Sequence, residues 1–254
     1  MHLSLTPRNI LAFLALLFIC HELHELIHII TGYLLCGCFG ERDFEGWEVC
    51  ATCPPTVNLA WITLAGPLLT YGLLWVGFML MSPRRPTRQR VLGWALLFAN
   101  LPLGRILPVL DREGDESYIT RQIIQKTSMT VLSWGTEIAI VFLLTLPVLL
   151  RAWQLLSPRH RLWVFSGFLI LPLLAETVLM NKLANQLLQL GVLAVPGLLG
   201  SPLLLNLWNA GWLVVLLLMF RSLETLLSPA QELAEPSSLA PNGGLLREQK
   251  QTNR

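Results

Sequence analysis

The segment HELHELIH, residues 21–28, places histidines and glutamates inside a long apolar stretch near the start of the chain. Within it, His24, Glu25 and His28 form the pattern HExxH. On an α-helix, residues four apart share a face, so both imidazoles can bind one Zn²⁺. A glutamate about 100° around the helix from the first histidine stays close enough to act on a water at the metal. The pattern therefore predicts a zinc site with Glu25 as general base and then general acid.

The apolar surroundings make this pattern more informative than it would be in a soluble protein. On a charged soluble helix, such a pentapeptide arises readily by chance. Inside a bilayer every polar side chain carries a cost of insertion, so a cluster of this kind indicates a role. The structural alternative is a polar network that satisfies the packing of neighbouring helices.

His21 and Glu22 are additional to HExxH. His21 lies on the same side of the helix as His24, but it is about 10 Å along the axis from His28. Binding all of these histidines to one metal with bonds of about 2.1 Å would strain the site. We expect His21 to support the site or relay protons, and Glu22 to make a hydrogen bond at the helix surface. A third zinc ligand has to come from another helix, because one straight helix cannot surround a metal.

Composition indicates that these residues lie in a membrane. The chain has 254 residues, of which 54% are hydrophobic and 13% charged, whereas soluble domains are about 25% charged. Apolar stretches of spanning length recur, and the alternating short segments of an outer-membrane barrel are missing from the sequence. We predict an all-α, polytopic membrane protein with about six transmembrane helices. The expected spans are 7–35, 58–81, 91–110, 129–150, 162–180 and 202–220.

The charges between these spans predict the orientation of the chain. The connections after the second and fourth spans are basic, and those after the first and third are acidic or mixed. The positive-inside rule places the basic connections, and with them both termini, in the cytoplasm, and the 36–57 loop outside. Residues 1–227 would form one domain integral to the lipid bilayer, and 228–254 a disordered polar tail. Residues 181–200 fit an interfacial, re-entrant or spanning segment equally. No basic block of the kind that binds nucleic acid occurs.

Four of the five cysteines lie in the 36–57 loop, as Cys36, Cys38, Cys50 and Cys53. An even number of cysteines in a loop outside the cytoplasm favours two disulfides. The alternatives are a zinc site, since CxC is followed by CxxC, and free thiols. Cys20, inside the first helix, is expected to pack as a small apolar residue.

Three segments together resemble the site-2 protease class of intramembrane zinc metalloproteases, peptidase family M50. They are HELIH (24–28), LAGPLLT (64–70) and ANLPLGRILPVLDREGDE (99–116), and the resemblance covers roughly residues 15–120. That family combines HExxH, a Gly-Pro-containing helix and an Asn-x-x-Pro-type motif that ends in an aspartate, the third zinc ligand. This chain departs from the pattern at Ile27, where glycine is usual, at Thr70, where asparagine is common, and in a longer spacing to the aspartate.

The resemblance implies that the third ligand is Asp111 or Asp115. Asp111 ends a proline-x-leucine-aspartate sequence but is followed by Arg112 instead of glycine. Asp115 follows a glycine-containing turn and is the preferred candidate. The resemblance also implies that Asn100 positions the substrate backbone or stabilises a developing oxyanion. The first and third spans run in the same direction, so HExxH and either aspartate reach the same face of the membrane.

Other polar residues also lie in apolar surroundings. For Glu137 and Glu176 the alternatives are a hydrogen bond to a neighbouring helix, or a place in a polar cavity or metal site. Arg105 is expected to extend toward the interface or to pair with an acid.

The sequence therefore predicts an integral membrane zinc endopeptidase that cleaves membrane proteins or peptides. Its substrate would be an extended segment, since a helix hides its carbonyls. The alternatives are a membrane metal transporter and a non-catalytic metal-binding scaffold. A transporter often shows internal symmetry, and the sequence shows none.

Overall fold

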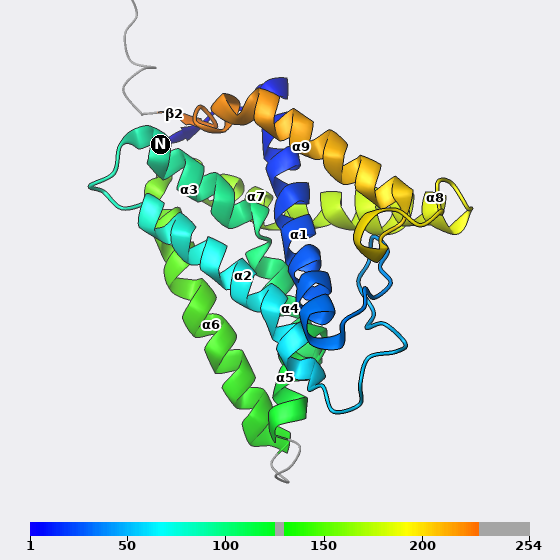
Figure 1. Ribbon diagram of the computed structural model, residues 1–254. Helices are drawn as coiled ribbons and strands as arrows, with labels where there is room; N and C mark the ends of the chain where they lie inside the picture. The colour runs from blue at the N-terminus through cyan, green and yellow to red at the C-terminus, as the bar shows by residue number, and fades with distance from the viewer. Residues whose placement is uncertain (125–129, 229–254) are drawn as a thin grey trace, which may run out of the picture.

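The computed structural model describes residues 1–124 and 130–228, and it is built almost entirely of helices (Figure 1). Among these residues, six helical segments are long and apolar enough to cross a membrane, which confirms the predicted all-α polytopic fold. The expected tail lies outside the described residues, apart from Ser228. The spans are α1 (Pro7–Cys36), α2 (Leu59–Leu80), α3 (Thr87–Ala99) with α4 (Pro102–Asp111), α6 (Thr130–Leu155), α7 (Arg161–Glu176) with η1 (Thr177–Ala184) and α8 (Asn185–Gln189), and α9 (Leu203–Leu223).

The local sequence sets both ends of α1, the helix that carries HExxH. The Thr6 hydroxyl oxygen accepts a hydrogen bond from the Asn9 amide, and Pro7 occupies the first helical position, where its missing N–H costs nothing. At the other end, Gly37 has a φ of 76°, and its amide donates to the Tyr33 carbonyl. Helix α1 packs against α2, α3 and α9 (Figure 1), so HExxH lies at the interior of the bundle.

The third span is broken, which corrects the prediction of one continuous helix over 91–110. Helix α3 ends at Asn100, Leu101 has a φ of 49°, and α4 begins at Pro102. Proline excludes its preceding residue from the right-handed helical region and cannot donate a backbone hydrogen bond, so the helix stops there. A second turn, with Arg112 and Gly114 at positive φ, separates α4 from α5 (Gly114–Ile124). The two candidate aspartates therefore lie on different helices.

The fifth span is longer than the sequence indicated. It continues from α7 through η1 and α8 to Gln189, so the predicted end near residue 180 is wrong. Residues 181–189 are polar enough to resemble a linker, but Asn185 is buried and its amide donates to the Asp43 carboxylate at 3.4 Å. This contact with the 37–58 connection gives the buried Asn185 amide a partner, so the helix can continue through a polar segment. The irregular segment comes later, between Leu190 and Pro202.

The basic connections and the N-terminus share one end of the molecule. The Met1 amino group donates to the Leu155 carbonyl at 2.9 Å. Strand β1 (His2–Leu3) pairs with β2 (Leu227–Ser228), which follows α9. Burial and the nearby cations Arg90 and Arg161 lower the pKa of the Met1 amino group. The 37–58 connection and α5 lie at the opposite end (Figure 1). Which end faces the cytoplasm stays a prediction.

The connection from α1 to α2 contains two disulfides, Cys36–Cys53 and Cys38–Cys50. This confirms the preferred interpretation of the cysteine pattern over a zinc site or free thiols. Cys20 is buried in α1 among apolar side chains, as expected.

Candidate metal centre

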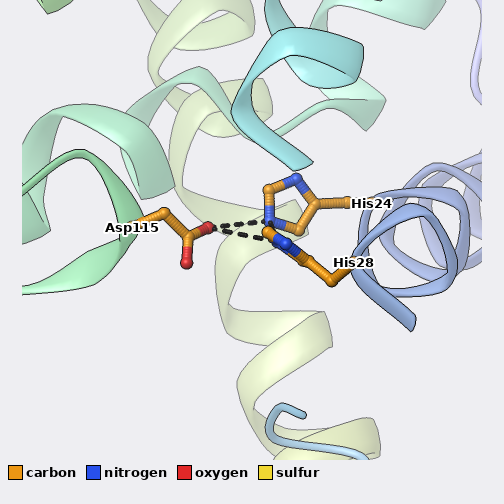
Figure 2. Close-up of side chains that lie close together, drawn as sticks. All are labelled: His24, His28 and Asp115. Carbon is orange, nitrogen blue, oxygen red and sulfur yellow. Dashed lines mark hydrogen bonds and ion pairs between the residues drawn. The ribbon is translucent and has the colours of Figure 1, made fainter. Parts of the chain in front are cut away.

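Two helices bring His24, His28 and Asp115 together (Figure 2). The histidines project from consecutive turns of α1, and the aspartate from the first turn of α5. The Asp115 Oδ2 atom lies 3.0 Å from His24 Nε2 and 3.5 Å from His28 Nε2. The two Nε2 atoms are 3.2 Å apart. Three potential ligand atoms thus converge on one point, although His24 and Asp115 are 91 positions apart in the sequence.

These distances fit a tetrahedral metal. Ligands that bind zinc at about 2.0–2.1 Å in a tetrahedron lie about 3.3 Å from one another. The distances of 3.0, 3.2 and 3.5 Å bracket that value. Two imidazoles and one carboxylate are also the ligand types that a catalytic zinc takes, with a fourth position left open.

The outer ring nitrogens of both histidines are held by α2. His28 Nδ1 lies 2.8 Å from the Ile62 carbonyl oxygen, which can only accept, so Nδ1 carries a proton. In the neutral ring, Nε2 then presents a lone pair toward His24 and Asp115. A metal ion at the centre, or a hydrogen bond donated by Nε2 of His24, accounts for the close approach of these groups. His24 Nδ1 contacts the Thr70 hydroxyl at 2.8 Å, and such contacts orient metal-binding imidazoles.

Gly66 allows α2 to approach the two imidazoles. A Cβ atom at this position would lie 2.1 Å from His28 Nε2 and 2.6 Å from His24 Cε1. Any other residue would therefore push α2 away from α1 or turn the histidines. In the sequence, Gly66 was notable only as part of the Gly-Pro pair of the family resemblance. The structure gives a physical reason for glycine here, because α2 approaches the two imidazoles closely.

Glu25 is buried next to these ligands. Its exposed fraction is 8%, and among the described residues its Oε2 atom has no hydrogen-bond partner. A buried carboxylate oxygen without a partner is costly, and such atoms in native proteins call for an explanation such as a catalytic role or a bound water. The structure thus places a buried carboxylate oxygen without a partner in the described chain one residue after His24.

Charged groups on α4 and α5 fix Asp115. The Arg105 guanidinium lies 3.5 Å from Asp115 Oδ2 and 3.8 Å from Glu116 Oε1, so Arg105 pairs with acids, one of its two predicted roles. The Tyr71 hydroxyl of α2 donates to Glu116 at 2.9 Å. Burial acts to raise the pKa of Asp115, but its contacts with His24 and His28 and the positive charge of Arg105 hold that pKa well below its usual value. Asp115 is therefore a carboxylate at neutral pH.

Comparisons with models of known protein families, with curated proteins and with solved structures find no match to this chain. The interpretation of this site therefore depends on the geometry and chemistry of its own residues.

The structure does not bring Asp111 and Asn100 into the cluster. Asp111 is exposed at the end of α4, outside the group of possible ligands. Asn100 is buried at the end of α3, where its Nδ2 donates to the Leu96 carbonyl at 2.7 Å and contacts Cys20 Sγ at 3.6 Å. Cys20 precedes His24 by one helical turn, about 6 Å. The expected role of Asn100 toward substrate stays a prediction.

The remaining acids and His21 have partners of their own. His21 Nδ1 lies 2.5 Å from Glu176 Oε1 on α7. Glu22 receives two hydrogen bonds from Arg42, at 2.6 and 2.9 Å, so its partner is an arginine of the 37–58 connection. The Ser117 hydroxyl donates to Glu137, which confirms the helix-to-helix alternative for that residue.

Trp47 is the contact that the sequence did not indicate. Its ring stacks on the His28 imidazole, with centroids 4.7 Å apart and an angle of 18° between the planes. In a membrane protein, tryptophans are expected chiefly as interfacial anchors, and no local pattern distinguishes this one.

Proposed function

We propose that this protein is an integral membrane zinc endopeptidase. The observation that carries the proposal is the convergence of His24, His28 and Asp115 beside Glu25, whose buried Oε2 lacks a protein partner in the described chain. The resemblance of the first three spans to the site-2 protease class supports the same activity.

The residues of the centre would divide the reaction among themselves. His24, His28 and Asp115 would hold the zinc, which when bound polarises the scissile carbonyl and makes water more acidic. Glu25 would accept the proton of the attacking water at Oε2 and then donate it to the leaving nitrogen. Thr70 and the Ile62 carbonyl would keep both imidazoles in the orientation that ligation requires.

The position of the centre suggests where substrates are cleaved. Asp115 follows the end of the third span, on the side of the molecule that carries the disulfide-bonded connection. Disulfides persist in oxidising compartments, so we place this end outside the cytoplasm, in agreement with the positive-inside rule. The substrate would be a membrane-associated segment that is unwound near this surface.

The proposal is tested with purified protein in detergent, by zinc analysis and cleavage of a reporter that contains a transmembrane segment. We expect wild type to contain zinc and to cleave. Glu25→Gln should retain zinc and lose about 10²–10⁴-fold of the cleavage rate, the range for a general acid–base group.

The alternatives predict other outcomes. Cleavage that survives Glu25→Gln contradicts the proposed mechanism. Bound zinc without cleavage in wild type indicates a metal-binding scaffold, and zinc flux into vesicles that is unaffected by Glu25→Gln indicates a transporter. The pairing of His21 with Glu176 and of Glu22 with Arg42 leaves these residues less available for an ion pathway.

A further inference from the structure

The connection between α1 and α2 folds back over α1 and does not extend away from it. The Arg42 side chain is buried and makes two hydrogen bonds to Glu22, one residue after His21 on α1. Residues 41–48 form a short hairpin, in which the Glu48 amide donates to the Glu41 carbonyl at 2.8 Å. Phe44 in the same turn is 1% exposed and packs edge-on against Trp208 of α9. The buried side chains of Arg42 and Phe44 therefore anchor the hairpin in the packed interior.

This hairpin carries Trp47 to the metal centre. Arg42 and Trp47 face each other across a β-bridge, so the contact of Arg42 with Glu22 also fixes the backbone of Trp47. The indole then lies parallel to the His28 ring, at 4.7 Å. The base of the hairpin is closed by Cys38–Cys50, and Cys36–Cys53 ties the outer ends of the same segment together.

The His28 ring is held from three directions. Trp47 covers one face, the Ile62 carbonyl binds Nδ1, and the His24 ring meets it edge-on with centroids 4.8 Å apart. The hydrogen bond to Ile62 fixes one ring atom, but the ring could still tilt about that bond. The parallel indole removes this freedom and thereby directs Nε2 toward Asp115.

We infer that Trp47 is a positioning residue of the metal centre, and that the disulfide-bonded hairpin is a built-in part of the zinc site. The inference rests on the proposed function, because it concerns zinc at His24, His28 and Asp115. Trp47 binds no metal itself. Its indole sets the plane of the His28 imidazole, and the Cys38–Cys50 disulfide and the Arg42–Glu22 ion pair set the place of the indole.

The test measures zinc affinity of the full-length protein in detergent by competition with a chromophoric chelator, together with the melting temperature of the zinc-free protein. Outer-shell partners of ligating histidines contribute about 10–100-fold to metal affinity. We expect Trp47→Leu, which removes the flat ring, to raise the zinc dissociation constant by about that factor. Trp47→Phe, which keeps an aromatic face, should restore most of the affinity. Trp163→Leu is the matched control, since Trp163 is 81% exposed.

The replacement by phenylalanine separates positioning from simple stabilisation. A structural role alone would change the melting temperature of the zinc-free variants and leave zinc affinity unchanged in those that fold. Zinc affinity equal to that of wild type in Trp47→Leu overturns the inference, and so does an equal loss in Trp47→Leu and Trp47→Phe.

If Trp47→Leu does not fold, the double variant Cys38→Ser with Cys50→Ser tests the same point with Trp47 in place. We expect its zinc affinity to fall about tenfold, and an unchanged affinity overturns the inference. Failure of the proposed function gives different results. Zinc bound by wild type without cleavage overturns the endopeptidase but leaves the role of Trp47 to be decided by the affinities, whereas absence of zinc from both wild type and His24→Ala overturns both proposals.

Discussion

The two halves of HELHELIH lie one turn apart on α1, and their polar side chains have different kinds of partners. His21 and Glu22 each face a partner of opposite charge, Glu176 and Arg42, at 2.5 and 2.6 Å. His24 and His28 instead face each other and a carboxylate, and the neighbouring Glu25 keeps an unpartnered oxygen within the described chain. Both halves place polar groups in an apolar helix, but only the second half brings three possible metal ligands to one point.

The difference gives a rule for membrane helices. A buried charged group with a fixed protein partner is explained by packing and by the cost of leaving it alone. A cluster of ligand atoms that converge on one point, beside a buried carboxylate oxygen without a partner, calls for a bound ion or for chemistry. The spacing in the sequence assigns His24 and His28 to the metal and leaves His21 aside, but it does not show that Glu176 pairs with His21 or that Arg42 pairs with Glu22.

The largest expected effect concerns the paired half. Glu22→Gln leaves the buried Arg42 guanidinium without its counter-charge, and such a loss costs about 3 kcal/mol or more of stability. We expect lower resistance to chemical unfolding in detergent. The folded fraction should bind zinc at the original stoichiometry when zinc is saturating, with an affinity lowered by about tenfold because Arg42 no longer fixes Trp47. Glu41→Gln, at an exposed position of the same connection, is the control. Methionine at both positions 22 and 42 should recover most of the stability. Folded Glu22→Gln that binds no zinc even at saturating zinc would contradict the separation of the two halves.

The second prediction concerns the third ligand. Asp115→Asn removes the anionic oxygen that faces both Nε2 atoms, so zinc affinity should fall by more than about 100-fold, above the range for outer-shell partners. Asp111→Asn, at the exposed end of α4, is the matched control and should bind zinc as wild type does. Chelator competition measures both, and the reverse order of effects would assign the site to Asp111.

Gly66→Ala should weaken zinc binding by about 10–100-fold, because its Cβ would lie 2.1 Å from His28 Nε2. Gly72 lies on the same helix, and a Cβ there would meet nothing within 4 Å. Gly72→Ala should therefore leave zinc affinity unchanged. Equal affinities in the two alanine variants would show that α2 does not need its close approach.

Thr70→Val should have the smallest effect, about tenfold in zinc affinity, because it removes one contact to the outer nitrogen of His24 and retains the shape of the side chain. Thr63→Val is the comparison, since the Thr63 hydroxyl donates to the helix backbone, at the Leu59 carbonyl. Zinc affinities that do not distinguish the two valine variants would remove Thr70 from the site.

Much of the fold was predictable, because it depends on local properties. A run of neighbouring apolar residues determines the length of each span, and Thr6 and Pro7 determine the start of α1. The break at Leu101 also has a local cause in Pro102, but an apolar proline-containing segment is equally compatible with a kinked helix. The continuation of the fifth span to Gln189 was one of the alternatives open for residues 181–200. The sequence did not decide between them, because Asn185 contacts Asp43, which is 142 residues away in the sequence.

The site was predictable to the extent that helical periodicity determines it. The spacing of His24 and His28 follows from one turn of α-helix, but the turn at Arg112–Gly114 decides which aspartate faces them. That turn places Asp111 at the end of α4 and Asp115 at the start of α5, and only Asp115 joins the two histidines. Trp47 was beyond prediction, because its position depends on a hairpin that a distant ion pair and two disulfides hold in place.

Zinc K-edge X-ray absorption of the purified wild-type protein tests the central claim most directly, since it reports the atoms around the metal. We expect one zinc per chain with only nitrogen and oxygen neighbours, at about 2.0–2.1 Å, and the outer-shell scattering of two imidazoles. Absence of zinc, or sulfur neighbours at about 2.3 Å, would contradict a metal centre formed by His24, His28 and Asp115.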